Sequence, residues 1–246
     1  MHGPTRLIES NLTPSPVSMR ERQKELNGGL ELAIPASSQE VIARLLTLGA
    51  TLNSRSCLTF LARQEPAILQ LLLDFGWDVN STETNFATVH LAVEYEISLG
   101  WLLEHGADPS VSSERRTIGS CLQRATALDY ASKRSDATAV NLLLSHGAKL
   151  DADAIYYAIG LRYQKNGTAT LQALIDHGAD VNYVSEKYFT PLHHVVLRGQ
   201  LDKLTLLLER GADPSIKALR RQISALEFAK EKGYTDMAEM MEAASR

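Results

Sequence analysis

The chain has little of what would mark a disulfide-bonded, metal-binding or membrane protein. Its 246 residues include two cysteines, Cys57 and Cys121, which lie far apart. This excludes a disulfide framework and a thiolate metal centre and fits a reducing compartment. No apolar run approaches the roughly 18 to 20 residues that a membrane span needs, and the first residues lack the apolar stretch of a secretory signal. We expect a protein of the cytoplasm or the nucleus.

An excess of charge of one sign is also missing. The formal net charge is -4, and 22% of the residues are charged, so nothing in the composition attracts a phosphate backbone or an anionic membrane. The hydrophobic fraction of 44% is sufficient for a continuous core. We therefore expect neither a nucleic acid nor a membrane as the partner.

Sequence motifs of catalysis are absent as well. The chain contains no G-x-S-x-G, H-E-x-x-H, G-x-x-x-x-G-K-[ST] or G-x-G-x-x-G, which carry nucleophiles, metals or phosphate loops. Its seven histidines lack cysteine or carboxylate neighbours at the spacing of metal ligands. We expect no catalytic residue, no cofactor and no metal site.

What the sequence does contain is one phrase repeated six times. A leucine-rich run is followed by a glycine and a small residue, as in LLLSHGAKLD and LLLERGADPS. Such a run is typical of the buried last turn of a helix, which glycine ends by adopting a left-handed conformation without a Cβ clash. The glycines are Gly49, Gly76, Gly106, Gly147, Gly178 and Gly211.

A second signal lies upstream of each helix-ending glycine, where a hydroxyl residue precedes an apolar stretch. One copy reads Thr190-Pro191-Leu192-His193, and Thr126 and Ser224 open two variants. A hydroxyl there caps the first turn of a helix, and proline is tolerated because that turn has no N–H partner to lose. Short breakers around Gly199 and Gly233 follow. Each unit therefore holds two helices, a turn between them and an extended loop after them.

This layout resembles the ankyrin repeat, which has a period of about 33 residues and the phrase T-P-L-H-x-A, matched here by Thr190 to His193. The resemblance implies an all-α, ankyrin-type repeat solenoid of about seven stacked helix-turn-helix units with extended loops between them. We expect residues 28–246 to form this solenoid, with a polar helix pair as the C-terminal cap. Residues 1–27 are expected to be an N-terminal tail, partly disordered or partly a capping helix from Pro16 to Leu26.

Polar residues that follow the repeat are expected to be structural. The resemblance implies that His90 and His193, at the histidine of the T-P-L-H phrase, bond the backbone of the neighbouring loop. Residues that precede or follow the helix-ending glycines should serve the helix end and the loop. These are His105, His146 and His177 before the glycines, and Asp78, Asp108, Asp180 and Asp213 after them.

The resemblance also implies a concave binding face made of the loops and the first helix of each pair. There the C-terminal half carries a basic stripe, and the loop of the sixth unit adds aromatic residues, which are enriched at interface anchors. Alternatively, the charges are only solvated and the aromatic residues pack under their own loop. The candidate partner-binding residues are Lys133, Arg134, Arg162, Tyr183, Tyr188, Phe189, Arg198, Arg220 and Arg221.

The sequence therefore predicts a non-catalytic protein-protein interaction module or scaffold, whose partner has acidic or extended segments and binds toward the C-terminal half. Two alternatives stay open. One is a substrate adaptor or regulatory subunit of a larger ubiquitin-ligase or transcriptional complex. The other is an atypical enzyme with its pocket on the concave face, for which the nearest candidates are His194, Tyr156, Tyr157 and Arg198.

Overall fold

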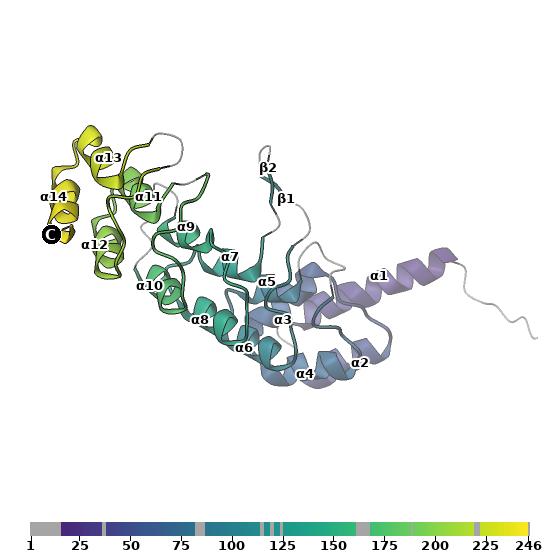
Figure 1. Cartoon of the computed structure of the whole chain (residues 1–246). Coiled ribbons are helices and arrows are strands. Elements are labelled where there is room, and N and C mark those ends of the chain that lie inside the picture. The colour runs from purple at the N-terminus through teal and green to yellow at the C-terminus, as the bar shows by residue number, and fades with distance from the viewer. Residues whose placement is uncertain are drawn as a thin grey trace, which may run out of the picture. The chain divides into compact units, whose positions relative to one another are not determined.

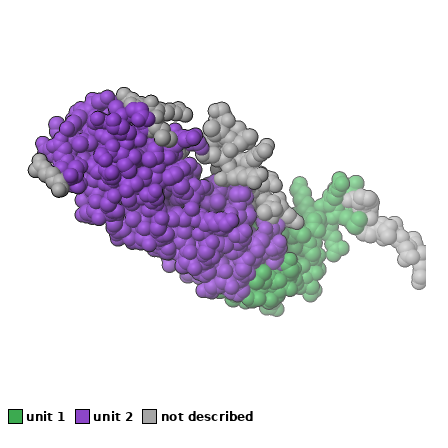
Figure 2. Space-filling model, in the orientation of Figure 1, with its two compact units in different colours: residues 1–76 green, residues 77–246 purple. Residues whose placement is uncertain are grey.

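The computed structural model describes residues 16–35, 38–81, 87–113, 116–118, 121–123, 125–160, 168–187, 189–218 and 222–245. Over these residues the chain forms fourteen helices and one short β-hairpin (Figure 1). The chain divides into two compact units, residues 1–76 and residues 77–246 (Figure 2).

The first unit contains two helix pairs. α1 packs against α2 and α3, and α4 packs against α2 and α3. Its core includes Leu30, Ile42 and Phe60, which are almost completely buried. The helices are α1 (Pro16–Ala33), α2 (Gln39–Thr47), α3 (Ser54–Arg63) and α4 (Pro66–Asp74).

The boundary that we expected between residues 27 and 28 falls inside α1. Gly28 and Gly29 continue this helix rather than ending it. A β-carbon at Gly29 would lie 3.6 Å from Leu45 Cδ2, so the small residue faces α2 closely. Gly29 therefore lies at the contact between α1 and α2, whereas nothing lies within 4 Å of a β-carbon built at Gly28.

The second unit contains five helix pairs in two rows (Figure 1). The first helices of the pairs pack in succession: α5 on α7, α7 on α9, α9 on α11 and α11 on α13. They are α5 (Thr88–Ala92), α7 (Ala127–Ala131), α9 (Ala154–Ile159), α11 (Pro191–Arg198) and α13 (Ala225–Lys232). The second helices are α6 (Glu96–Glu104), α8 (Thr138–Ser145), α10 (Ala169–Asp176), α12 (Leu201–Glu209) and α14 (Thr235–Ala244). The all-helical class and the seven expected pairs are confirmed in the described residues.

The hairpin is an addition that the sequence analysis did not include. The long segment after Gly106 contains β1 (Arg116–Ile118) and β2 (Cys121–Gln123), which pair antiparallel. At its base the N–H of Ser113 donates to the carbonyl of Ala125 at 2.8 Å. Strands of three residues are too short to show the alternation of apolar and polar residues that predicts a strand.

The glycines that end helices and the hydroxyl residues that begin them act as the sequence predicts. The six helix-ending glycines have φ between 82° and 98°. The hydroxyls of Thr190, Thr126 and Ser224 accept the N–H three residues further on, at the start of α11, α7 and α13. In α7 and α13 a carboxylate, from Asp129 and Glu227, closes a capping box.

One buried position departs from the apolar pattern. Counted back from the helix-ending glycine, Lys203 of α12 matches Ala139 of α8. It is 2% exposed, and its Nζ donates to the carbonyls of Ala158 at 2.7 Å and Ile159 at 3.1 Å, the last residues of α9. The ammonium group therefore supplies donors for carbonyls that the end of a helix leaves without partners.

Thr170 of α10 stands at the same position and acts in the same way. Its hydroxyl donates to the carbonyl of Arg134 at 2.6 Å, just after the first helix of the preceding unit. A lysine at this position is less favourable than a threonine, because burial disfavours the charged ammonium and lowers the pKa of Lys203 to about 8. The fifth and sixth units are thus joined by a buried cation.

The glycine interpretation can be tested with two matched alanine variants. Nothing lies within 4 Å of a β-carbon built at Gly211 or at Gly100 of α6, so neither variant introduces a clash. Gly211→Ala should lower the free energy of unfolding by about 1–2 kcal/mol, because only Gly211 has a positive φ. Gly100→Ala should raise it by up to about 1 kcal/mol. Urea unfolding measures both, and equal effects would contradict the interpretation.

The buried lysine predicts a pH dependence. Its pKa falls from the ordinary 10.5 to about 8, so between these values the unfolded chain binds more protons than the folded one. Stability then rises with pH over this window, by at most about 1.4 kcal/mol per pH unit. Lys203→Met should remove the rise, while the exposed control Lys187→Met should keep it. Urea unfolding from pH 8 to 10 measures the free energy of unfolding of each variant. A difference in this free energy between wild type and Lys203→Met that does not change with pH argues against a buried ammonium.

Candidate functional site

The histidines of the T-P-L-H position reach from one unit to the loop of the next. The Nε2 of His90 lies 3.1 Å from the carbonyl of Ala125, and the Nε2 of His193 lies 3.0 Å from that of Ile223. Burial is the main cause that lowers the pKa of both histidines. The implied role of these residues is confirmed, and it leaves their rings in structural hydrogen bonds.

Tyr156 takes the same role in the fifth unit, where the phrase has no histidine. Its hydroxyl lies 2.6 Å from the carbonyl of Phe189 and 2.7 Å from that of Tyr183. Burial raises the pKa of Tyr156, so the hydroxyl stays a donor. Two of the candidate aromatic residues are therefore brought together through their backbones, at the two ends of one loop.

The loop held by Tyr156 is tightly turned. Ser185 and Phe189 exchange backbone hydrogen bonds of 2.8 and 3.0 Å, and Phe189 has a φ of 67°. The Phe189 ring lies 6.0 Å from that of His193, and the Tyr183 ring lies 6.3 Å from that of Tyr156. Both side chains are half-buried, so they pack against the first helices and also keep part of their surface in solvent.

Lys133 and Arg134 follow α7 and already have partners. Lys133 Nζ lies 4.8 Å from the centre of the Tyr157 ring and 5.3 Å from that of Tyr130. The Arg134 guanidinium pairs with Glu94 at 3.1 Å and lies 3.4 Å from Asp136. At this point the basic stripe is therefore partly neutralised.

Arg198 ends α11 beside the buried histidine of that helix. Its charge and that of Lys203 add to burial in lowering the pKa of His194 to about 4. His194 is 4% exposed and meets the Tyr156 ring edge-on at 5.7 Å. Within the described residues, the buried Nε atoms of Arg198 and Arg134 both lack a hydrogen-bond partner, but Arg134 makes ion pairs and Arg198 makes none. Of the candidate cations described, Arg198 is the least engaged.

The remaining candidates, Arg162, Tyr188, Arg220 and Arg221, lie outside the described residues. Arg162 follows α9, Tyr188 precedes Phe189, and Arg220 and Arg221 precede Ser224 in the sequence. Their part in binding stays a prediction.

A second set of side chains links neighbouring loops. Asn182 Nδ2 donates to the carbonyl of Gly211 at 3.2 Å, and Asn182 Oδ1 accepts the N–H of Asp213 at 2.8 Å. Asn80 makes the same two bonds, to Gly106 and Asp108. An asparagine does both because its amide carries a donor and an acceptor.

The sequence weakens this link at other junctions. Ser110 accepts only the N–H of Lys149, at 3.0 Å. Asp151 has no donor to offer, and its carboxylate accepts the N–H of Asp153 at 2.8 Å. Among the described residues, Asp151 makes no bond to the next loop. The junction between the fourth and fifth units therefore lacks the amide link.

The acidic series and the histidines before the glycines are structural, as expected. Each Asp accepts the N–H two residues further on, at 2.8 or 2.9 Å, and His105 and His146 bond the carbonyl four residues back. His177 instead contacts the side chain of Asn141 at 3.2 Å. The Asp series is Asp78, Asp108, Asp180 and Asp213.

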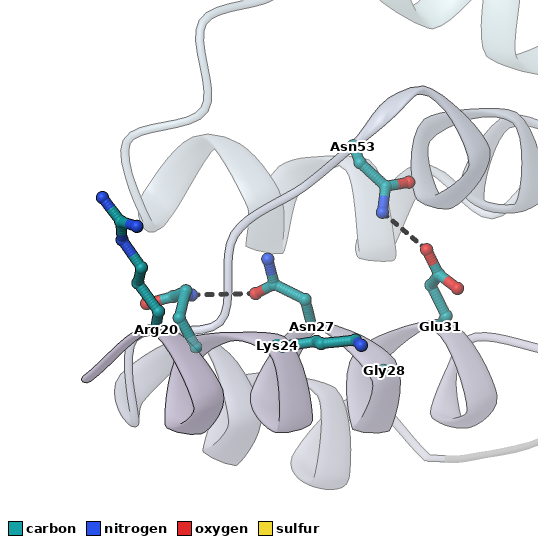
Figure 3. A pocket seen from close by; sticks show the side chains of 7 residues that line it. Arg20, Lys24, Asn27, Gly28, Glu31 and Asn53 are labelled. Carbon is teal, nitrogen blue, oxygen red and sulfur yellow. Dashed lines mark hydrogen bonds between the residues drawn. The ribbon is translucent and has the colours of Figure 1, made fainter. Parts of the chain in front are cut away.

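The first unit has an open polar groove along α1 (Figure 3). Asn53 Nδ2 donates to Glu31 at 2.5 Å across it, and Gln23 donates to Asn27 at 2.8 Å. Arg20 and Lys24 line the same groove. Its amides and its carboxylate are already engaged with one another, so the groove serves to hold α1 against the loop before α3.

No catalytic constellation emerges over the described ranges. They contain no cluster of three or more histidine, cysteine or carboxylate side chains that could hold a metal ion. Nor do they include a helix long and apolar enough to cross a membrane.

Sequence reasoning missed two residues that organise the site, Tyr156 and Lys203. Tyr156 was named from the sequence only as a candidate of the alternative enzyme, and not as the substitute for the histidine of the T-P-L-H phrase. Lys203 stands where other units have small or apolar residues, so an internal alignment of the second helices would have singled it out.

Comparisons with known proteins support the repeat pattern. Residues 128–218 match the family model for ankyrin repeats in three copies. The chain is 32% identical over 122 residues to ankyrin repeat protein nuc-2 of Neurospora crassa, covering 48% of this chain and 11% of that protein. It is 30% identical over 162 residues to the B-cell lymphoma 3 protein homolog of mouse, covering 62% and 34%. The chain thus spans a minor part of these relatives.

Solved structures show the same fold. The ankyrin repeat domain of Bcl-3 matches with a TM-score of 0.65 at 24% identity, covering 86% of this chain and 97% of that one. The ankyrin repeat domain of human ASB11 matches with a TM-score of 0.61 at 21% identity, covering 81% and 90%. Together with the helix pairs, the glycines that end the helices and the T-P-L-H contacts, these matches show that residues 128–218 are ankyrin repeats and that the described chain has the ankyrin-repeat fold.

Proposed function

We propose that this chain is a non-catalytic protein-protein interaction module that binds a partner through the loops and first helices of its second unit, toward the C-terminal half. The observation that carries the proposal is the set of side chains, led by Tyr156 and Asn182, that bond loops of the second unit to a neighbouring helix pair or loop. A surface fixed in this way binds with little cost in conformational entropy.

The charges of the described candidates favour a centre near α11. Lys133 and Arg134 already have aromatic and acidic partners, whereas Arg198, at the other end of α11 from the loop that carries Phe189, makes no ion pair among the described residues. Arg162, Tyr188, Arg220 and Arg221 complete the proposed surface. A partner with acidic or extended segments fits this combination of cations and aromatic rings.

The chain as an adaptor or regulatory part of a larger protein or complex is the second candidate. It is favoured by the lengths of the relatives, since the matched stretches are small parts of longer proteins. Two of these are named palmitoyltransferase AKR1, from Lachancea kluyveri, and 2-5A-dependent ribonuclease, from mouse, with 20% and 7% of their lengths matched. In such a setting the repeats would select the partner while another segment or subunit acts on it. A place in the cytoplasm or nucleus belongs to the same proposal.

An enzyme that uses His194 and Tyr156 has less support. His194 is buried with a pKa of about 4, and the hydroxyl of Tyr156 is held by two carbonyls. Burial keeps the His194 ring from contact with a substrate, and it raises the pKa of Tyr156 so that the hydroxyl stays protonated, so neither group is placed to act as a general base.

A four-residue loop variant tests the binding face. Replacing Tyr188, Phe189, Arg220 and Arg221 by Ala should reduce recovery of at least one partner about tenfold in quantitative affinity purification, as expected for a hot spot. The matched control replaces exposed residues of the second helices, Glu104, Ser145, Gln172 and Glu209, by Ala. If the loop variant retains every partner of the wild type, the assigned face is wrong.

Two reciprocal variants test the loop links. Asn182→Asp removes the donor to Gly211 and should lower the free energy of unfolding by about 1–2 kcal/mol. Asp151→Asn gives the junction of the fourth and fifth units the amide it lacks, and it should raise the free energy by about 1 kcal/mol. Urea unfolding of both variants measures the two changes. Changes of the same sign in the two variants would show that the amide links do not stabilise the loops.

A further inference from the structure

Apolar side chains stay exposed at the turns of the sixth and seventh units, at the end of the chain that is yellow-green in Figure 1. Leu197 is 41% exposed and Leu201 42%, on either side of the turn between α11 and α12. Tyr234 is 38% exposed at the turn between α13 and α14. None of these residues belongs to the loop face described above.

Two hollows flank the Tyr234 side chain. One has a volume of about 280 Å³, is lined by Leu201, Tyr234, Asp236 and the glycines of both turns, and has the buried Met237 as part of its wall. The other has a volume of about 250 Å³ and extends from Tyr234 along α14 to Glu239. We call Leu197, Leu201, Tyr234 and these hollows the turn groove. Each hollow has room for one apolar side chain.

The charges left at the turn groove are acidic. Asp202 and Asp236 lie exposed in the first turns of α12 and α14, and neither has an ion-pair partner among the described residues. Of the neighbouring cations, Lys230 is paired to Glu242 at 2.6 Å and Lys232 lies over the Phe228 ring at 5.6 Å, while Arg198, between Leu197 and Gly199, is half-buried and lines neither hollow. The groove therefore combines apolar hollows with free carboxylates, which is the opposite of the basic loop face.

We propose that the turn groove binds an amphipathic helix of a partner protein. This helix would place two apolar side chains in the hollows beside Tyr234 and a lysine or arginine near Asp202 and Asp236. An amphipathic helix presents apolar residues at a spacing of three and four positions, with charged residues on its flanks. Its basic flank complements the carboxylates. The site is separate from the loop face and does not depend on it.

A synthetic helix serves as the probe. A fluorescein-labelled peptide of about 18 residues, with leucine on one face and lysine on the others, is titrated with the full chain, and anisotropy gives its Kd. Leu201→Ser and Tyr234→Ser should each raise the Kd at least about fivefold, as for interface anchors. Tyr234→Phe should bind as the wild type does, because the ring is retained. The Asp202→Asn, Asp236→Asn double variant should raise the Kd and weaken its dependence on salt.

Ile97→Ser is the matched control. Ile97 is 54% exposed at the start of α6 and lines neither hollow of the turn groove, so its loss should leave the Kd unchanged. An equal loss in Ile97→Ser would mean general adsorption to apolar surface and would overturn the proposal. So would equal binding of a peptide with glutamate in place of lysine. A concentration-dependent dimer in light scattering, lost in Tyr234→Ser, would assign the groove to a second copy of the chain and also overturn it. Circular dichroism confirms that each variant is folded.

Discussion

The extended loops of the second unit depend on hydrogen bonds from side chains of the preceding helix pair or loop. A loop that crosses the end of a helix pair has backbone N–H and C=O groups without partners in a ladder, and such groups are costly when they stay unpaired in a buried place. His90, Tyr156 and His193 supply them from the first helices, and Asn80 and Asn182 from the preceding loops. The rigidity of the loop surface therefore depends on these hydrogen bonds.

This constraint explains the positions of most polar residues that could be mistaken for functional groups. His105 and His146, the Asp series and the residues of the T-P-L-H position, His90, Tyr156 and His193, bond backbone groups, whereas His177 bonds the side chain of Asn141. His194 and Lys203 are also buried, at positions where other units have apolar, aromatic or small residues. Lys203 closes the end of the short helix α9, and its charge contributes to lowering the pKa of its neighbour His194. Most of these polar side chains therefore bond the backbone of the chain itself.

The helix pairs could be predicted because most of them begin or end at a local signal. A glycine at a positive φ and a hydroxyl at an N-cap act within one turn of the helix, so they are readable from the sequence alone. The β-hairpin after Gly106 gave no such signal, because its strands have three residues each. The roles of Tyr156 and Lys203 depend on contacts with residues 27 to 45 positions away, which no local pattern contains. The ion pair of Arg134 could not be predicted either, because its partner Glu94 is 40 positions away.

Two surfaces of different character follow from the arrangement. The loops and first helices carry cations and aromatic rings, with Phe189 before the start of α11 and Arg198 at its end, whereas the turns of the last two units carry apolar hollows and exposed carboxylates. The proposed partners differ accordingly, since one surface suits acidic or extended segments and the other a basic amphipathic helix. A chain with both could hold two partners at once.

The account depends on loops that are fixed by the amide links, and hydrogen exchange measures this directly. The N–H groups of Asp108 and Asp213 are bonded to Asn80 and Asn182, while the N–H of Asp180, which follows the junction without an amide link, has no such bond among the described residues. By NMR, the Asp108 and Asp213 amides should exchange at least about tenfold more slowly than the Asp180 amide, after correction for intrinsic rates. Equal exchange at all three positions would contradict the claim that these side chains hold the loops in place.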